Sequence, residues 1–340
     1  MSELRQDPFG GYWTIIASDR ARRPMDLSPH SPPRPPPVSN CPLCPENENR
    51  TPGEIAAIRP PGEAANSPGW TVRVIPNLFP ALQSESSGKG ESEGLLKWVA
   101  GRGAHEVVVE SPLHDRGLGD HSLQHLTDLL RVCRDRLREL MDDPDHAYVQ
   151  LFKNHGEAAG ASLTHPHIQI LATPVCPDAI NREANAFRLH QERQGGCLLC
   201  DLIRTEIESG RRVLRAGKAF IAMAPFASRV PFEILIAPRA HLESFQDLDP
   251  AGITSLAGIL KEQLGRVKEK LQDPPYNLAL HTAPNSRFRT GPYHWHLEIL
   301  PRLVRLGGFE WGTGMYINPV PPEEAAKILL GTGTEHGRND

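Results

Sequence analysis

The sequence predicts an α+β fold made of two tandem copies of one unit, each an antiparallel sheet with packed helices. Two observations predict it: each half carries a Cys-x-x-Cys pair, and each carries a His-x-His segment followed by Gln or Glu and then Ile-Leu. These features are Cys41/Cys44 with residues 165–171, and Cys197/Cys200 with residues 294–300. A pattern repeated in the same order within one chain indicates a duplicated unit.

The spacing of a second histidine in each half supports the duplication. His114 and His241 each end an apolar run, and the distance to the next paired histidine is similar in both halves. His165 follows His114 by 51 residues, and His294 follows His241 by 53. We therefore divide the chain into an N-terminal unit, residues 1–176, and a C-terminal unit, residues 177–340.

Each unit is expected to have a helix and a strand between its two histidines. Leucine and other apolar residues recur every three or four positions over residues 122–142 and again over residues 251–271, a pattern typical of an amphipathic helix. Short apolar runs at residues 147–153 and 276–281 follow these helices and predict strands. Helix packing across an antiparallel sheet is the arrangement that this order favours.

Composition limits the class of protein. The 340 residues are 39% hydrophobic and 23% charged, which is ordinary for a soluble globular protein. The net charge of −4 argues against a nucleic-acid-coating protein, because such proteins are basic. No run of about 18 apolar residues occurs, and the first residues lack an apolar signal segment. We expect a cytoplasmic protein with neither nucleic acid nor membrane as a partner.

The segment from Asn154 to Gln169 points to phosphate chemistry. Alternate side chains of a strand share a face, so His165, His167 and Gln169 should project together. The preceding loop is rich in Gly and Ala, and exposed backbone N–H groups of such a loop can bind phosphate oxygens. A neutral imidazole can be a nucleophile or a metal ligand near pH 7.

The cysteine pairs predict zinc sites. Tetrahedral zinc takes four N or S ligands, and each half offers two thiols and two imidazoles. A redox-active pair and unpaired structural thiols are the competing interpretations. One zinc is expected and a second is possible. The two sets are Cys41, Cys44, His114 and His165, and Cys197, Cys200, His241 and His294.

These motifs together resemble the galactose-1-phosphate uridylyltransferase family, a nucleotidyl-transferring branch of the histidine-triad superfamily. The resemblance covers nearly the whole chain, and it makes each of the two units histidine-triad-like. The segments that carry it are residues 18–24, 41–44, 77–80, 111–114, 165–169 and 308–318.

The resemblance implies a ping-pong nucleotidyltransferase that acts on nucleoside diphosphate sugars. His167 would attack the α-phosphorus, release a sugar 1-phosphate and carry the nucleotide to a second phosphate acceptor. Gln169 would donate a hydrogen bond to a phosphoryl oxygen, and because a carboxamide is a poor acid or base, it favours transfer over hydrolysis.

Three functions are compatible with this resemblance. The first is UDP-glucose:hexose-1-phosphate uridylyltransferase in galactose metabolism, with galactose 1-phosphate as acceptor. The alternative is an ADP-glucose phosphorylase, in which inorganic phosphate is the acceptor. A distant alternative is a non-catalytic, zinc-stabilised nucleotide-binding module.

The resemblance also implies substrate contacts and a homodimer whose sites are completed by the neighbouring subunit. Arg20 and Arg23 could equally be surface charges, Asn77 could serve a turn, and His296 could pack beside the sheet. Family members often have Cys where Ala161 stands, and their second half binds a metal through a Glu and three His. The residues implied to contact substrate are Arg20, Arg23, Asn77, Asn154, Gly160, Ser162, His296, Glu310 and Trp311.

Overall fold

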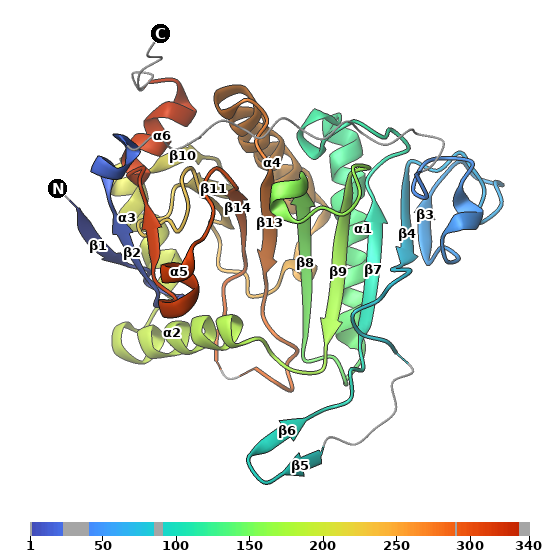
Figure 1. Ribbon diagram of the computed structural model, residues 1–340, viewed down its shortest axis with the longest axis horizontal. Helices are drawn as coiled ribbons and strands as arrows, with labels where there is room; N and C mark the ends of the chain where they lie inside the picture. Colours follow the sequence, from blue (N-terminus) through green and yellow to red (C-terminus); the bar gives the residue numbers. More distant parts are fainter. Residues whose placement is uncertain (1, 23–40, 85–90, 290, 333–340) are drawn as a thin grey trace.

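A ten-stranded antiparallel sheet forms the centre of the computed structural model, which describes residues 2–22, 41–84, 91–289 and 291–332 (Figure 1). In spatial order its strands are β10 (Val213–Ala216), β11 (Phe220–Met223), β12 (Ile234–Pro238), β14 (His296–Pro301), β13 (Tyr276–His281), β8 (Tyr148–His155), β9 (His167–Thr173), β7 (Ala104–Val109), β4 (Val72–Pro76) and β3 (Ala56–Ile58).

The strand order shows the duplication directly. Counted outward from the middle, one half reads β8, β9, β7, β4, β3 and the other reads β13, β14, β12, β11, β10. These are the same positions along each repeat, so the α+β expectation of two related units is confirmed. The units share one sheet, because β8 and β13 pair antiparallel from Tyr276 opposite His155 to Leu280 opposite Leu151.

Two long helices cover one face of this sheet. They are α1 (Leu123–Asp142) and α4 (Pro250–Leu271), which also pack on each other. The side chains of Ser122 and Asp249 cap them by accepting hydrogen bonds from the backbone N–H groups of His125 and Gly252. Their apolar stripes join the largest hydrophobic cluster, so the periodicity in the sequence located both helices to within a residue.

The opposite face is covered at its two ends. Phe9 and the helices α2 (Asp178–Gln194) and α3 (Leu198–Ser209) pack over β11 and β12. At the other end, the segment that carries Cys41 and Cys44 packs with Trp70 against β7. Between these covers, the central strands carry half-buried polar side chains, namely Gln150, Asn154, Gln169 and Asn277.

The two ends of the described chain meet in a small sheet. Its strands are β1 (Glu3–Gln6), β2 (Trp13–Ile16) and β15 (Tyr316–Asn318), so residues near the N-terminus pair with the C-terminal half. The remaining elements are the helices α5 (Gly308–Thr313) and α6 (Pro322–Leu330), the hairpin β5 (Glu91–Glu93) and β6 (Leu96–Trp98), and the 3-10 turns η1 (Ser18–Arg22), η3 (Glu48–Arg50), η4 (Leu118–Asp120), η5 (Glu157–Ala159) and η6 (Phe245–Asp247).

The helices of the described part include none with the length and apolar character needed to cross a membrane.

Both His-x-His strands begin later than their sequence suggests. β9 starts at His167 and β14 at His296, so the first histidine of each pair lies just before its strand.

Candidate active site

His167 opens β9 with its side chain on the face opposite α1. Its Nδ1 lies 2.9 Å from the carbonyl oxygen of His165 and donates to it, which leaves Nε2 unprotonated and free to react. The side chain is 6% exposed, and burial lowers its pKa from the ordinary histidine value. A neutral imidazole with a free Nε2 is what a nucleophile requires.

Gln169 lies two residues along β9, on the same face. Its Oε1 lies 2.9 Å from Nε2 of His105 on the neighbouring strand β7. The Nδ1 of His105 accepts a hydrogen bond from the backbone N–H of Ala81 at 3.2 Å, so Nε2 carries the proton and donates to Gln169. The carboxamide NH2 of Gln169 is therefore turned away from His105 and can donate elsewhere.

The small-residue loop between β8 and β9 is held from both halves of the chain. Asn277 on β13 donates to Oδ1 of Asn154 and to the carbonyl of Ala159, both at 2.8 Å. Gly160 takes a left-handed conformation with φ +89°, which favours glycine. Ser162 is exposed at the end of this loop. Asn154, Gly160 and Ser162 thus line one loop beside the start of β9.

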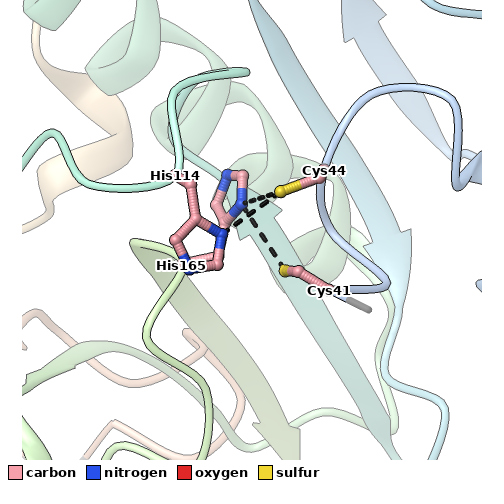
Figure 2. A group of neighbouring side chains, drawn as sticks. All are labelled: Cys41, Cys44, His114 and His165. Carbon is pink, nitrogen blue, oxygen red and sulfur yellow. Dashed lines mark hydrogen bonds between the residues drawn. The ribbon is translucent and has the colours of Figure 1, made fainter. Parts of the chain in front are cut away.

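The first cysteine and histidine set is assembled as its spacing predicted (Figure 2). Nδ1 of His114 lies 3.2 Å from Sγ of Cys44, and Nδ1 of His165 lies 3.4 Å from Cys44 and 3.7 Å from Cys41. All four ligand atoms lie within 4.8 Å of one another. In a tetrahedral zinc site with usual Zn–S and Zn–N bonds, a sulfur and a nitrogen are about 3.6 Å apart.

Hydrogen bonds on the far side of each imidazole support this fit. Nε2 of His165 donates to the carbonyl of Ser111 at 2.8 Å, and Nε2 of His114 donates to the Thr164 hydroxyl at 3.0 Å. With the proton on Nε2, both Nδ1 atoms are left as electron-pair donors that point at the thiols. The residues therefore fit a zinc ion.

The second set repeats this geometry. Nδ1 of His294 lies 3.4 Å from Sγ of Cys197 and 3.5 Å from Sγ of Cys200, and its Nε2 donates to the carbonyl of Pro238. The ring of His241 stands at 84° to that of His294, compared with 83° between His114 and His165. One difference is that His241 is exposed.

A third group, which the sequence did not suggest, surrounds His296. Glu183 on α2, His281 and His296 bring three donor atoms within 4.8 Å of one another. His281 lies between the carboxylates of Glu183 and Glu298, at 2.9 and 3.4 Å. Burial would lower the pKa of His281, but the two carboxylates raise it to about 9. Glu183, His281 and Glu298 therefore form a buried ion-pair network, whereas Nε2 of His296 has no hydrogen-bond partner among the described residues.

His296 itself is fully buried. The Phe9 ring covers it edge-on with a centroid separation of 5.1 Å, and its Nδ1 faces the carbonyl of His294. The two roles expected for His296, contact with substrate and packing beside the sheet, both stay predictions.

The other residues implied to bind substrate, apart from Arg23, lie beside His105, in η1 and in α5. Asn77 contacts His105 and accepts a hydrogen bond from the N–H of Phe79, so it is both next to Gln169 and part of a turn. Arg20 lies in η1, which follows β2 of the small sheet, and Glu310 and Trp311 lie in α5, which contacts β15. Figure 1 shows α5 away from β9. Glu310 caps α5 by accepting from the N–H of Gly307, and Trp311 is 76% exposed. Arg23 lies outside the described residues.

Sequence reasoning missed His105, Asn277, Glu183 and His281. The alternation of His105, Val107 and Val109 could have placed His105 on one face of its strand, but only the pairing of β7 with β9 brings it to Gln169.

The two halves of the chain match the two domains of one known family. Residues 1–177 match the family described as galactose-1-phosphate uridyl transferase, N-terminal domain, and residues 183–315 match the C-terminal domain. An ADP-glucose phosphorylase of Arabidopsis thaliana is 39% identical over 332 residues, 96% of this chain and 92% of that protein. A galactose-1-phosphate uridylyltransferase of Thermotoga maritima is 29% identical over 98% of this chain and 100% of its own length.

A solved structure, the Arabidopsis thaliana ADP-glucose phosphorylase with bound ADP-glucose, has a TM-score of 0.81 at 35% identity and covers 97% of this chain and 98% of that one. The two tandem units and their relatives define a nucleotidyltransferase with a histidine-triad-like fold. The chain belongs to the galactose-1-phosphate uridylyltransferase family, which confirms the resemblance in its motifs.

Proposed function

We propose that the chain moves a nucleotidyl group from a nucleoside diphosphate sugar to a phosphate acceptor through a covalent intermediate on His167. The observation that carries the proposal is the hydrogen bond from Nδ1 of His167 to the backbone carbonyl of His165, which leaves Nε2 as the free nitrogen. Nε2 attacks the α-phosphorus, the bond to the bridging oxygen breaks, and sugar 1-phosphate leaves. An acceptor phosphate oxygen then displaces Nε2 and regenerates the imidazole.

The surrounding residues have supporting roles in this proposal. Gln169 donates to a phosphoryl oxygen, and the loop with Asn154, Gly160 and Ser162 binds the phosphates. Because Gln169 cannot act as a general base, it does not activate water for attack on the nucleotidyl-histidine. The intermediate is therefore hydrolysed slowly and persists until a phosphate acceptor binds. Asn77, which lies 3.2 Å from the His105 ring, contacts the nucleoside in this proposal.

Inorganic phosphate is the acceptor that the comparisons favour. The chain is 39% identical to the Arabidopsis thaliana ADP-glucose phosphorylase and 29% identical to the Thermotoga maritima uridylyltransferase. We therefore put ADP-glucose phosphorolysis first. UDP-glucose:hexose-1-phosphate uridylyl transfer is the second candidate, since several relatives are named for it and the same intermediate serves both.

A substrate matrix tests this order. The enzyme is mixed with ADP-glucose or UDP-glucose and then with inorganic phosphate or galactose 1-phosphate, and the nucleotide product is identified. We expect ADP from ADP-glucose and phosphate. UDP-galactose as the main product would favour the second candidate, and no product from any pair would contradict both. His167→Asn is the matched control and should be inactive throughout.

We also propose zinc at both Cys2His2 sets. The ion would supply structural stabilisation: at the first set it ties the segment of Cys41 and Cys44 to the end of β7 and the start of β9. The donor set and the protonation of the far nitrogens support this assignment.

A homodimer is proposed as the active form. Arg20, Glu310 and Trp311 flank the small sheet of their own chain, so they would reach substrate in the neighbouring subunit. The exposure of Trp311 supports this role. Arg23 would act with Arg20.

Two further expectations stay predictions: the division of the chain between residues 176 and 177, and the cytoplasmic location.

A further inference from the structure

His105 stands out among the titratable groups that the proposed mechanism does not use. It lies on β7, which pairs with β9, and its ring lies on the same face of the sheet as His167 and Gln169. Both of its ring nitrogens are engaged with groups of the site. Nδ1 accepts from the backbone N–H of Ala81, and Nε2 lies 2.9 Å from Oε1 of Gln169. Nδ2 of Asn77 lies 3.2 Å from the same Nε2, but an amide nitrogen cannot accept, so this is a contact and not a hydrogen bond from His105.

The contact with Ala81 fixes which nitrogen of His105 carries the proton. A backbone N–H can only donate, so Nδ1 must offer its lone pair and Nε2 must hold the hydrogen. That hydrogen has an acceptor in Oε1 of Gln169 at 2.9 Å. His105 is thus held as a neutral donor aimed at Gln169.

This donor decides which end of the Gln169 carboxamide faces the substrate. A terminal carboxamide can turn over by rotation of its last torsion, which exchanges its oxygen and its NH2 group. With the oxygen facing the substrate, it would repel the anionic phosphoryl oxygens instead of donating to them. The hydrogen bond from His105 holds the oxygen end and leaves the NH2 group for the phosphate.

We propose that His105 is a positioning residue that sets the orientation of the Gln169 carboxamide for the nucleotidyl-transfer step. The inference rests on the proposed function and goes beyond it, because it assigns a role to a residue outside the His-x-His-x-Gln motif. The same ring accepts a hydrogen bond from the N–H of Ala81, in the segment that follows Asn77, so one side chain links Gln169 to the segment proposed to contact the nucleoside.

The test measures the single-turnover rate of adduct formation with ADP-glucose and with UDP-glucose in the wild type and three variants. His105→Phe keeps a ring but removes both hydrogen bonds, whereas His105→Gln keeps a donor and an acceptor. We expect a loss of roughly 10- to 100-fold in the rate constant for His105→Phe and substantial rescue in His105→Gln. The half-saturating sugar nucleotide concentration should change much less. His190→Phe, a histidine on α2 that bonds Asp201, is the control and should match the wild type.

A double-mutant cycle separates positioning from a general structural effect. In a Gln169→Ala background, His105→Phe should add little, because there is no carboxamide left to orient. A full additional loss in that background would overturn the inference, as would a wild-type rate in His105→Phe. A thermal unfolding curve shows whether His105→Phe is folded. If it is not, His105→Asn replaces it, because the Asn side chain is too short to make both contacts. Absence of any adduct in the wild type would overturn the proposed function and this inference together.

Discussion

Neighbouring histidines of this chain are suited to different chemical roles because different ring nitrogens are engaged by the backbone. In His165 the carbonyl of Ser111 binds Nε2, so Nδ1 points to the thiols. In His167 the carbonyl of His165 binds Nδ1, so Nε2 is free. The residue types were readable from the sequence, but these nitrogen assignments were not, because they depend on which carbonyl lies beside each ring.

Gln169 gives the first prediction at this scale. Gln169→Ala should lower the rate of adduct formation by about 10²-fold, the usual effect of removing one donor to a developing charge. The measurement is a rapid-quench time course of adduct formation at saturating nucleotide sugar. A rate within a factor of two of the wild type would show that the carboxamide does not touch the reacting phosphate.

His281 gives a prediction about stability and pH. Its pKa in the folded state is raised to about 9 by Glu183 and Glu298, above the ordinary value of about 6.5 expected in the unfolded chain. The stabilisation is therefore complete below pH 6.5 and is lost as the pH rises through 9. The free energy of unfolding should fall between pH 6.5 and 9.5 by about 3 kcal/mol more in the wild type than in His281→Gln.

Urea titrations at the two pH values measure this difference. Glu183 and Glu298 stay ionised throughout, since their pKa values are lowered, with that of Glu298 about 2. Titration of groups elsewhere cancels between the two proteins. Equal pH dependence in both would mean that His281 is not charged in the folded protein.

At the scale of single elements, periodicity predicted the helix and the strand between the two histidines of each unit. The helical stripes placed α1 and α4, and the apolar run at residues 276–281 matched β13. The pairing partners were not predictable, because register joins residues far apart in the sequence. Asn277 is the clearest example. In the sequence it is one polar residue within a predicted strand, and only the pairing of β13 with β8 places it beside Asn154.

Asn277→Ala should loosen the loop that is proposed to hold the phosphates. It removes two hydrogen bonds to that loop from a side chain that does not itself contact His167. We expect roughly a tenfold loss in kcat/KM, of the size seen when a supporting partner of a site is removed. Steady-state kinetics measure it, with Asn185→Ala on α2 as the control. Unchanged kinetics would show that the loop keeps its shape without β13.

At the scale of the whole molecule, the repeat in the sequence predicted two related units but not their union in one sheet. β8 and β13 each lie at the edge of their own unit, and an unpaired edge strand exposes backbone groups that need partners. Pairing the two edges satisfies those groups, and it places the loop of one unit beside a strand of the other. The candidate site is therefore built from both halves, although its proposed nucleophile comes from one.

The two proposed zinc ions should differ in accessibility across the molecule. The first set has buried Cys41, Cys44 and His165, whereas His241 of the second set is exposed. A chelator with a colorimetric zinc reporter should release two zinc ions per chain, one faster than the other. Cys200→Ser should remove the faster phase alone. A single phase, or one zinc ion per chain in the wild type, would contradict this assignment.

The most direct test of the central claim is to locate the covalent intermediate. The protein is incubated with ADP-glucose or UDP-glucose without an acceptor, and its mass is measured intact and after digestion under conditions that preserve acid-labile phosphoramidates. The account predicts one added nucleoside monophosphate, on the peptide that contains His167, absent from His167→Asn and released on adding the acceptor. An unmodified protein that still turns over substrate, or a nucleotide attached at another residue, would contradict it.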